Sequence, residues 1–302
     1  MPDIIIHGAS GFLGKHFLRK LIIEKIPAIV LARTSSNINE FKNNNLVKIY
    51  RYSNSISELS NSEIGVSGSV FFEFSWQGVF GSERNNEEQL DINIPLISDS
   101  ITIAHKLNVK HWVGVGSQAE YGNLDKRISE KDACNPTTLY GKAKLHCSQI
   151  SAELCQKFGM EHSWLRLFSV YGPDDNHMWL IQYLIKEMVA GKEINVTKGE
   201  QLWDYLYIDD VSEMFFKLKD AKGVGVANLG SGKAVQVKYI IEKIKELTNS
   251  VSKVNFGAVP YRFDQVMLME ADISKLSKHL NWIPEINIDE GLEKTISHLK
   301  LI

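Results

Sequence analysis

Three residues in the middle of the chain have side chains that could move a proton at a carbonyl group. Tyr140 and Lys144 stand four positions apart in LYGKAKL, and Ser117 ends the apolar run VGVGS. On a helix, this spacing places two side chains on the same face. A lysine ammonium beside a phenol stabilises the phenolate and lowers the pKa of the tyrosine, so the phenol can exchange a proton near neutral pH. Tyr and Lys at this spacing occur by chance on many helices, and the serine upstream strengthens the prediction.

A glycine-rich turn near the start of the chain is suited to binding a dinucleotide. GASGFLG places Gly8, Gly11 and Gly14 between the first expected strand and the first expected helix. Small residues here let the backbone approach a pyrophosphate, and the free N–H groups at the positive end of the helix stabilise the anion. Glycine triplets also occur in packing turns, but the strand–turn–helix context favours a cofactor. The expected cofactor-binding residues of this turn are Gly8, Ser10, Gly11, Phe12, Leu13 and Gly14.

The end of the second expected strand favours NADP over NAD. An NAD site usually has Asp or Glu here to bind the ribose 2′-hydroxyl, whereas AIVLARTSS has Ala32 at that position and Arg33 next to it. Without the carboxylate a 2′-phosphate is not repelled, and Arg33 can bind it through charge-assisted hydrogen bonds. Ser35 or Ser36 could add a hydroxyl donor. The alternatives are an NAD site and a solvated arginine; we expect NADP(H), with Arg33 and Ser35 in its site.

Alternating apolar and amphipathic segments must position these residues. Strands are expected at 3–7, 28–32, 46–52, 69–74, 110–115 and 163–168, and helices at 12–24, 87–107 and 137–158. Runs this apolar indicate strands covered on both faces, and the alternation predicts an α/β fold with a Rossmann-type doubly wound parallel sheet. We assign residues 1–172 to an NADP-binding domain that carries the catalytic residues. Residues 173–302 mainly form a smaller C-terminal substrate-binding lobe, with some segments returning to the first domain.

Composition argues against several classes of function. The 302 residues include 34 basic and 36 acidic ones, with no basic stripe for nucleic acid and no polybasic run for a membrane surface. Cys134, Cys147 and Cys155 lack disulfide or zinc spacing, which predicts free thiols, no metal site and a reducing cytoplasm. No apolar segment approaches the ~20 residues that cross a bilayer, and the first residues lack a signal-peptide pattern. We expect a cytoplasmic protein.

The motifs together resemble the extended short-chain dehydrogenase/reductase family, in its nucleotide-sugar branch. The matching segments are GASGFLG (8–14), GSQAEYG (116–122), the Tyr140–Lys144 pair, RLFSVYGP (166–173), WDYLYIDDV (203–211) and NLGSG (228–232). The resemblance implies that Ser117 and Tyr140 hydrogen-bond a reacting sugar carbonyl and that Tyr140 exchanges the proton. It implies that Lys144 holds the nicotinamide ribose while tuning Tyr140. A nucleotide-sugar substrate and a homodimer are also implied.

Departures from the family pattern narrow the chemistry. Family members that dehydrate sugars place an acid–base pair, typically Asp-Glu, directly after the serine or threonine, where this chain has Gln118 and Ala119. Neither can exchange a proton, so we expect no 4,6-dehydration. Related reductases that also epimerise C3 and C5 use a cysteine near this point and a histidine after YGP. Ala119 removes the first, and His177 in DDNHMW stands only in the neighbourhood of the second.

Substrate-binding residues are expected in the loops that follow the strands. Trp76 and Arg84 follow the fourth strand, in a loop that lies near the sugar in the family. The resemblance therefore implies that Trp76 packs against the sugar and that Arg84 binds a hydroxyl or phosphate; the alternative is a surface loop with one packed aromatic residue. Arg262 matches an arginine that clamps a pyrophosphate, although its usual Arg-Pro-Gly-Asp context reads Arg-Phe-Asp-Gln. Trp203 stacks on a base or sugar, or packs in the core. The full expected set is Trp76, Arg84, Ser117, Gln118, Ser169, Trp203 and Arg262.

These residues favour an NADPH-dependent reductase that acts on the C4 ketone of a nucleotide-linked 4-keto-6-deoxyhexose, in activated deoxysugar biosynthesis. An NAD-dependent nucleotide-sugar 4-epimerase is the alternative enzyme, because it needs only the serine, tyrosine, lysine and a retained cofactor. The missing acidic residue at position 32 counts against it. A non-catalytic NADP-binding regulatory protein on the same fold is the alternative of another class, and it would need neither Tyr140 nor Lys144.

Overall fold

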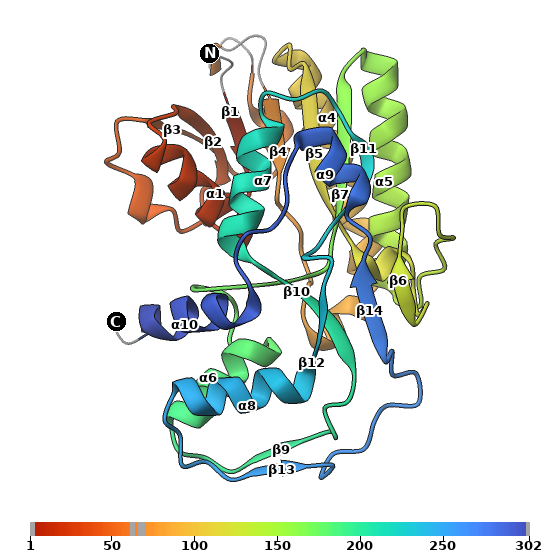
Figure 1. Ribbon diagram of the computed structural model, residues 1–302. Coiled ribbons are helices and arrows are strands. Elements are labelled where there is room, and N and C mark those ends of the chain that lie inside the picture. Colours follow the sequence, from red (N-terminus) through yellow and green to blue (C-terminus); the bar gives the residue numbers. More distant parts are fainter. Residues whose placement is uncertain (1–3, 61–63, 66–69, 300–302) are drawn as a thin grey trace.

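The computed structural model describes residues 4–60, 64–65 and 70–299. At the centre of this described part lies a parallel sheet (Figure 1). In spatial order its seven described strands are β11 (Gly225–Leu229), β7 (Glu161–Leu167), β5 (His111–Ser117), β4 (Val70–Glu73), β1 (Ile4–His7), β2 (Ala28–Arg33) and β3 (Val47–Tyr52). Each neighbouring pair is parallel. The order reverses between β1 and β4, and this switch point is where doubly wound sheets bind ligands. The predicted Rossmann-type fold is confirmed.

Apolar side chains on both faces account for these strands. All four residues of β1 and all four of β4 are buried, as expected of strands covered by helices on both sides. The predicted strand bounds agree with the observed ones to within about two residues, the usual uncertainty at element ends. Asp3 and Ser69, at the predicted starts of the first and fourth strands, lie outside the described residues.

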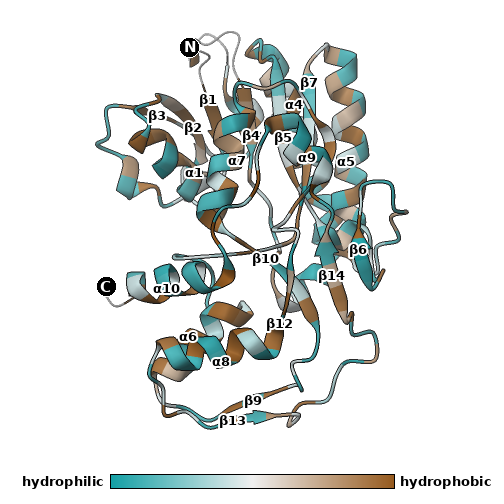
Figure 2. Cartoon of the chain, viewed as in Figure 1, coloured by the Kyte–Doolittle hydropathy of each residue, from teal (hydrophilic) through white to brown (hydrophobic). Residues whose placement is uncertain are grey.

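Helices cover the two faces of the sheet in pairs. On one face, α1 (Phe12–Ile23) packs against α7 (Ile208–Leu218), with the rings of Phe17, Phe72 and Phe215 in one cluster. On the other face, α4 (Asn93–Lys106) packs against α5 (Leu139–Phe158). Figure 2 shows brown, apolar stretches along the strands and mixed colours on the helices around them.

The expected helix at 87–107 is divided in two. Its first turn is α3 (Glu88–Asp91), and α4 starts again at Asn93. Pro95 explains the break, because proline has no N–H group to donate to the carbonyl oxygen of Asp91 four positions earlier. Short 3₁₀ helices complete this half of the chain: η1 (Asn39–Phe41), η2 (Ile56–Glu58), η3 (Gly81–Asn85) and η4 (Gln118–Glu120).

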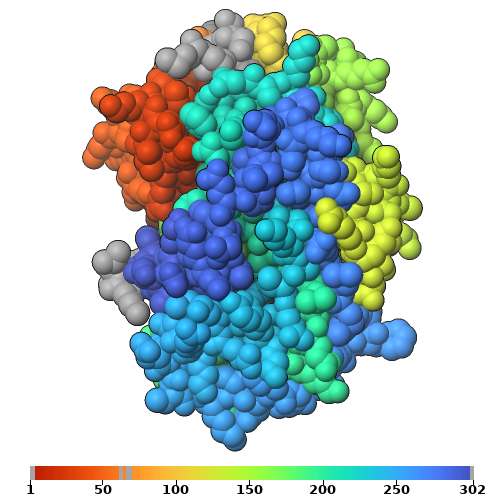
Figure 3. Space-filling model, in the orientation of Figure 1, coloured from red at the N-terminus to blue at the C-terminus, as the bar shows by residue number. Residues whose placement is uncertain are grey.

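A second, smaller sheet lies below the first in Figure 1. Its strands are β12 (Ala234–Gln236), β10 (Leu202–Tyr207), β14 (Leu268–Ala271) and β6 (Lys126–Ile128), with β8 (Ser169–Tyr171) paired to the far end of β10. The remaining elements are α6 (Leu180–Val189), α8 (Val237–Leu247), α9 (Ser274–Leu280), α10 (Ile288–Leu299) and the pair β9 (Ile194–Val196) and β13 (Val254–Phe256). In Figure 3 the dark-blue surface of α10 lies between the upper and lower parts of the molecule.

The chain passes between the two sheets several times. β11 and α7 come from the C-terminal half but join the first sheet, whereas β6 comes from the first half and pairs with β14. The domain boundary at residue 172 therefore stays a prediction. One buried carboxylate links the sheets: Asp204 of β10 accepts hydrogen bonds from the N–H groups of Gly232, just after β11, and of Ala271 in β14.

Within the described ranges, no helix is long and apolar enough to cross a membrane. The three cysteines are free. The same ranges contain no cluster of three or more His, Cys, Asp or Glu residues arranged to hold a metal ion.

Candidate active site

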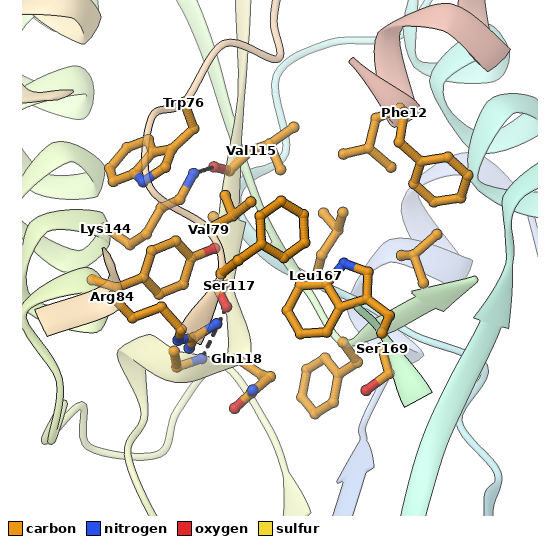
Figure 4. Close-up of a pocket in the computed structure, with 18 of the residues that line it drawn as sticks. Phe12, Trp76, Val79, Arg84, Val115, Ser117, Gln118, Lys144, Leu167 and Ser169 are labelled. Carbon is orange, nitrogen blue, oxygen red and sulfur yellow. Dashed lines mark hydrogen bonds between the residues drawn. The ribbon is translucent and has the colours of Figure 1, made fainter. Parts of the chain in front are cut away.

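A cleft of about 940 Å³ opens at the carboxyl ends of β1, β4 and β5 and extends toward the second sheet (Figure 4). It brings together the predicted catalytic and substrate-side residues. These lining residues are Ser117, Tyr140, Lys144, Trp76, Arg84, Gln118, Ser169, Trp203 and Arg262. Of the predicted cofactor residues, Gly8, Gly11, Phe12, Leu13 and Gly14 also line it. Ser10, Arg33 and Ser35 are exposed and lie outside this lining.

Ser117 is held at the end of β5 by a capping box. Its Oγ accepts a hydrogen bond from the N–H of Ala119 at 3.2 Å, and its own N–H donates to Glu120 Oε1 at 2.9 Å. Glu120 is completely buried, and its carboxylate also accepts from Trp164 Nε1 and from Arg166 Nε, at 2.9 and 2.7 Å. The side chain of Glu120 is therefore engaged behind Ser117, while Gln118 and Ala119 line the cleft.

The start of α5 brings Tyr140 next to Ser117. Thr138 caps the helix, because its Oγ1 accepts from the N–H of Gly141 at 3.1 Å. Gly141 packs against η4 so closely that a Cβ there would lie 2.4 Å from the carbonyl oxygen of Ala119. Burial raises the pKa of the Tyr140 phenol, and the charge of Arg84 and a hydrogen bond with the Ser117 hydroxyl act in the opposite direction.

Lys144 lies one turn further along α5, and its ammonium is buried. Its Nζ donates a hydrogen bond to the carbonyl oxygen of Val115 at 2.7 Å and lies 3.5 Å from the centre of the Trp76 ring. Burial lowers the pKa of Lys144 to about 7. Trp76 is fixed in turn by a hydrogen bond from its Nε1 to Gln89 Oε1 at 3.1 Å.

The glycine turn fits a dinucleotide pyrophosphate. Gly8 has φ +89°, and a Cβ there would lie 2.7 Å from the backbone nitrogen of Ser75. A Cβ at Gly14 would lie 2.5 Å from Gly8 O, whereas a Cβ at Gly11 would meet only that oxygen, at 3.5 Å. Packing therefore requires Gly8 and Gly14, and the space beside Gly11 is open. Helix α1 has no acidic residue in its first turn and no side-chain cap, so its N-terminal N–H groups suit an anion.

A second arginine supports the loop that follows β2. Arg51 of β3 lies in register with Ala32, and its Nη1 donates to the carbonyl oxygens of Arg33, Thr34 and Ser36, at 2.8, 3.3 and 2.9 Å. Arg51 was missed in the sequence, since its position beside Ala32 follows only from the strand register. The guanidinium of Arg51 thus supports the backbone of the loop where a ribose 2′-substituent is expected.

A buried chain of three polar residues joins the ends of β1, β3 and β4. Nδ1 of His7 lies 2.7 Å from Glu73 Oε2, and its Nε2 lies 2.6 Å from the hydroxyl of Tyr52. Glu73 also accepts from the N–H of Ser75 at 2.7 Å and lines the cleft. This contact holds the backbone of the loop that carries Trp76. Sequence reasoning missed the chain because its members are far apart in the sequence.

The substrate side of the cleft is less enclosed. Trp203 is partly buried, and its Nε1 donates to Val266 O at 3.4 Å. Arg262 is exposed at the mouth. His177 is exposed and does not belong to the residues that line the cleft, whereas Asp175, two positions earlier, does.

Comparison with known proteins identifies the family. The sequence model of the NAD dependent epimerase/dehydratase family matches residues 4–230. The chain belongs to this family. This confirms the resemblance predicted from the motifs, and the chain is an enzyme of an NAD dependent epimerase/dehydratase type.

Individual relatives of the epimerase/dehydratase family span nearly the whole chain. CDP-abequose synthase of Salmonella muenchen is 29% identical over 303 residues, covering 97% of this chain and 97% of its own. UDP-glucuronate 4-epimerase of Thermodesulfobacterium geofontis is 29% identical over 226 residues, covering 74% of this chain and 69% of its own. The crystal structure of UDP-glucuronic acid 4-epimerase from Bacillus cereus, in complex with UDP-glucuronic acid and NAD, is similar in fold, with a TM-score of 0.84 at 22% identity and 99% of each chain covered.

Proposed function

We propose that this protein is an NADPH-dependent reductase of the C4 ketone of a nucleotide-linked 4-keto-6-deoxyhexose. The observation that carries the proposal is the composition of the cleft beside Ser117. Gln118 and Ala119 line it and cannot exchange protons, and the nearby carboxylate of Glu120 is engaged by Arg166. At the positions that follow Ser117, no side chain is thus free to exchange a proton, and Tyr140 is the donor next to the serine, which supports carbonyl reduction over dehydration. The full-length similarity to CDP-abequose synthase supports a nucleotide sugar as substrate.

In such a reduction, Ser117, Tyr140 and Lys144 each have a different role. A dinucleotide held at the glycine turn would supply the hydride for the carbonyl carbon. The Ser117 hydroxyl donates a hydrogen bond to the carbonyl oxygen, and Tyr140 gives that oxygen its proton. Lys144 would hold the nicotinamide ribose, and its ammonium would stabilise the phenolate left on Tyr140. The sugar product carries one added hydride and one added proton, and Tyr140 recovers its proton from solvent.

NADPH is the proposed cofactor because the ribose end of the turn is basic. Ala32 offers no carboxylate for a 2′-hydroxyl, and Arg33 and Arg51 both lie at this end of the sheet. A 2′-phosphate would gain charge-assisted hydrogen bonds here. The homodimer implied by the resemblance and the cytoplasmic location expected from the composition belong to the same proposal.

A nucleotide-sugar 4-epimerase that retains NAD is the second candidate. It is favoured by the similarity to UDP-glucuronate 4-epimerase and by the same serine, tyrosine and lysine. An NADPH oxidation assay with CDP-, GDP- and dTDP-linked 4-keto-6-deoxyhexoses separates the two. The reductase consumes NADPH with at least one of these substrates. Absence of turnover with all of them, together with NAD bound to the purified protein and interconversion of stable sugars, would support the epimerase.

A further inference from the structure

Arg84 lies directly against the tyrosine of the active site. Its Cζ is 4.2 Å from the centre of the Tyr140 ring, and both side chains line the cleft. Figure 4 labels Arg84 on the same side of the cleft as Ser117 and Gln118. Among the described residues, no carboxylate lies within ion-pair distance of this guanidinium. Among the described residues the charge of Arg84 is therefore not neutralised by a carboxylate, and its guanidinium lies over the ring of Tyr140.

The backbone keeps the two residues together. Arg84 belongs to η3, and the next residue, Asn85, accepts a hydrogen bond at its Oδ1 from the N–H of Leu139 at 3.2 Å. Leu139 directly precedes Tyr140 at the start of α5. The side chain of Gln89 also holds η3, because its Nε2 donates a hydrogen bond to the carbonyl oxygen of Glu83 at 3.0 Å. The hydrogen bond between Leu139 and Asn85 thus ties η3 to the helix that carries the tyrosine.

Charged groups reach Tyr140 from three elements. Lys144, on the same helix, has its Nζ 5.8 Å from the centre of the Tyr140 ring, further away than the guanidinium of Arg84. The charge of Glu120, in η4, raises the pKa of Tyr140, but this carboxylate is paired with Arg166. Arg84 of η3 is the cation closest to the ring. Cys147 of α5 and Glu73 of β4 both raise the pKa of Lys144.

The two cations differ in how constant their charge is. A guanidinium stays protonated throughout the working range of an enzyme. The ammonium of Lys144 does not, because burial lowers its pKa to about 7, so that about half of it is neutral near that pH. Of the charges acting on Tyr140, Arg84 is the strongest one that opposes burial.

We propose that Arg84 is a positioning residue for proton transfer, whose guanidinium over the Tyr140 ring stabilises the phenolate formed when Tyr140 gives up its proton. A cation over an aromatic face is bound by the electrons of the ring, and a phenolate ring offers more of them than a phenol. The interaction therefore strengthens as the proton leaves, which is the condition for accelerating the step. This inference rests on the proposed function only in taking Tyr140 as the proton donor.

A titration of Tyr140 itself tests the inference without any substrate. The protein, with and without NADP⁺, is labelled with 3-fluorotyrosine, whose phenol is more acidic, and followed by ¹⁹F NMR against pH. The Tyr140 signal, one of ten, is assigned by its loss in Tyr140→Phe. Arg84→Gln should raise the midpoint by about one pH unit or more, as loss of a nearby opposite charge does. Arg84→Lys keeps a positive charge at this position, so its Tyr140 midpoint should stay close to that of the wild type. Arg127→Gln, at an exposed arginine of β6, should leave the midpoint unchanged.

The kinetics supply the second readout. Arg84→Gln should lower kcat about tenfold or more with a smaller change in the KM of the sugar, since about one pH unit corresponds to a factor of ten. A raised KM with an unchanged kcat and an unmoved Tyr140 midpoint would instead make Arg84 a substrate-binding residue and overturn the inference. If none of the 4-keto sugars is turned over but the midpoint still moves, the proposed function fails and the inference on Arg84 stands.

Discussion

Glu120 and Arg166 form an ion pair, with 2.7 Å between Oε2 and Nε, that is buried directly behind Ser117. The same carboxylate accepts the N–H of Ser117, so the pair and the end of β5 are one hydrogen-bonded unit. Removing one member of a buried pair is costly because the other charge remains without compensation. The serine is thus positioned by a charge that does not itself belong to the lining of the cleft.

Glu120→Ala should destabilise the protein by about 3–5 kcal/mol, because it leaves the Arg166 guanidinium buried and unpaired. It should also lower activity by freeing the backbone at Ser117. Urea unfolding measures the stability. The control is Arg127→Gln, which removes an exposed pair with Glu270 and should cost less than about 1 kcal/mol. Equal losses for the two variants would contradict this role for Glu120.

Lys144 should make stability depend on pH in a defined direction. Its folded pKa, about 7, lies below the ordinary value of 10.5, so burial penalises the protonated form. The penalty is fully present below about pH 7 and disappears as the pH rises toward the unfolded pKa. Lys144→Met should therefore unfold at higher urea than the wild type near neutral pH, and the advantage should shrink by about pH 10, while activity is lost. Lys142→Met, at an exposed position on the same helix, should show no such dependence.

Arg33→Ala should discriminate between the two cofactors. If Arg33 binds a 2′-phosphate, its loss removes charge-assisted hydrogen bonds worth about 1.5–3 kcal/mol, which is a rise in the KM for NADPH of roughly tenfold to a hundredfold. The KM for NADH should change little. Steady-state kinetics with both cofactors provide the measurement, and a parallel rise for NADH would point to a general loss of structure in the loop that Arg51 also holds.

Ser117→Ala should lower kcat by about 10²–10³, the usual cost of removing one donor to a developing oxyanion. Because the backbone N–H of residue 117 still donates to Glu120, stability should fall only slightly. Ser117→Thr keeps the hydroxyl and should restore most of the rate. A Ser117→Ala variant with wild-type kcat would remove the serine from the proposed chemistry.

Local patterns in the sequence predict the fold and much of the cleft. The apolar runs of β1 and β4 and the glycine turn before α1 can be recognised because each is a continuous segment with its own residue pattern. Ser117, Tyr140 and Lys144 were predicted from motif spacing, and the structure places all three at one cleft.

Long-range pairings account for what the sequence did not reveal. His7, Glu73 and Tyr52 meet only because the strand order places β1 beside β4 and the ends of β1 and β3 near each other. Strand β6 has three residues, too short for a periodic pattern, and its partner β14 lies in the other half of the chain. The contact of Arg84 with Tyr140 depends on how the loop after β4 folds onto α5, which no spacing in the sequence encodes.

Isotope transfer shows directly whether hydride passes from NADPH to C4 of a nucleotide-linked sugar. The protein is incubated with NADPH carrying deuterium at the transferable position of the nicotinamide and with nucleotide-linked 4-keto-6-deoxyhexoses. We expect one deuterium at C4 of the reduced sugar, seen by NMR and mass spectrometry, and none with Tyr140→Phe. Interconversion of stable nucleotide sugars on a retained NAD, with no deuterium gained from added NADPH, would contradict it.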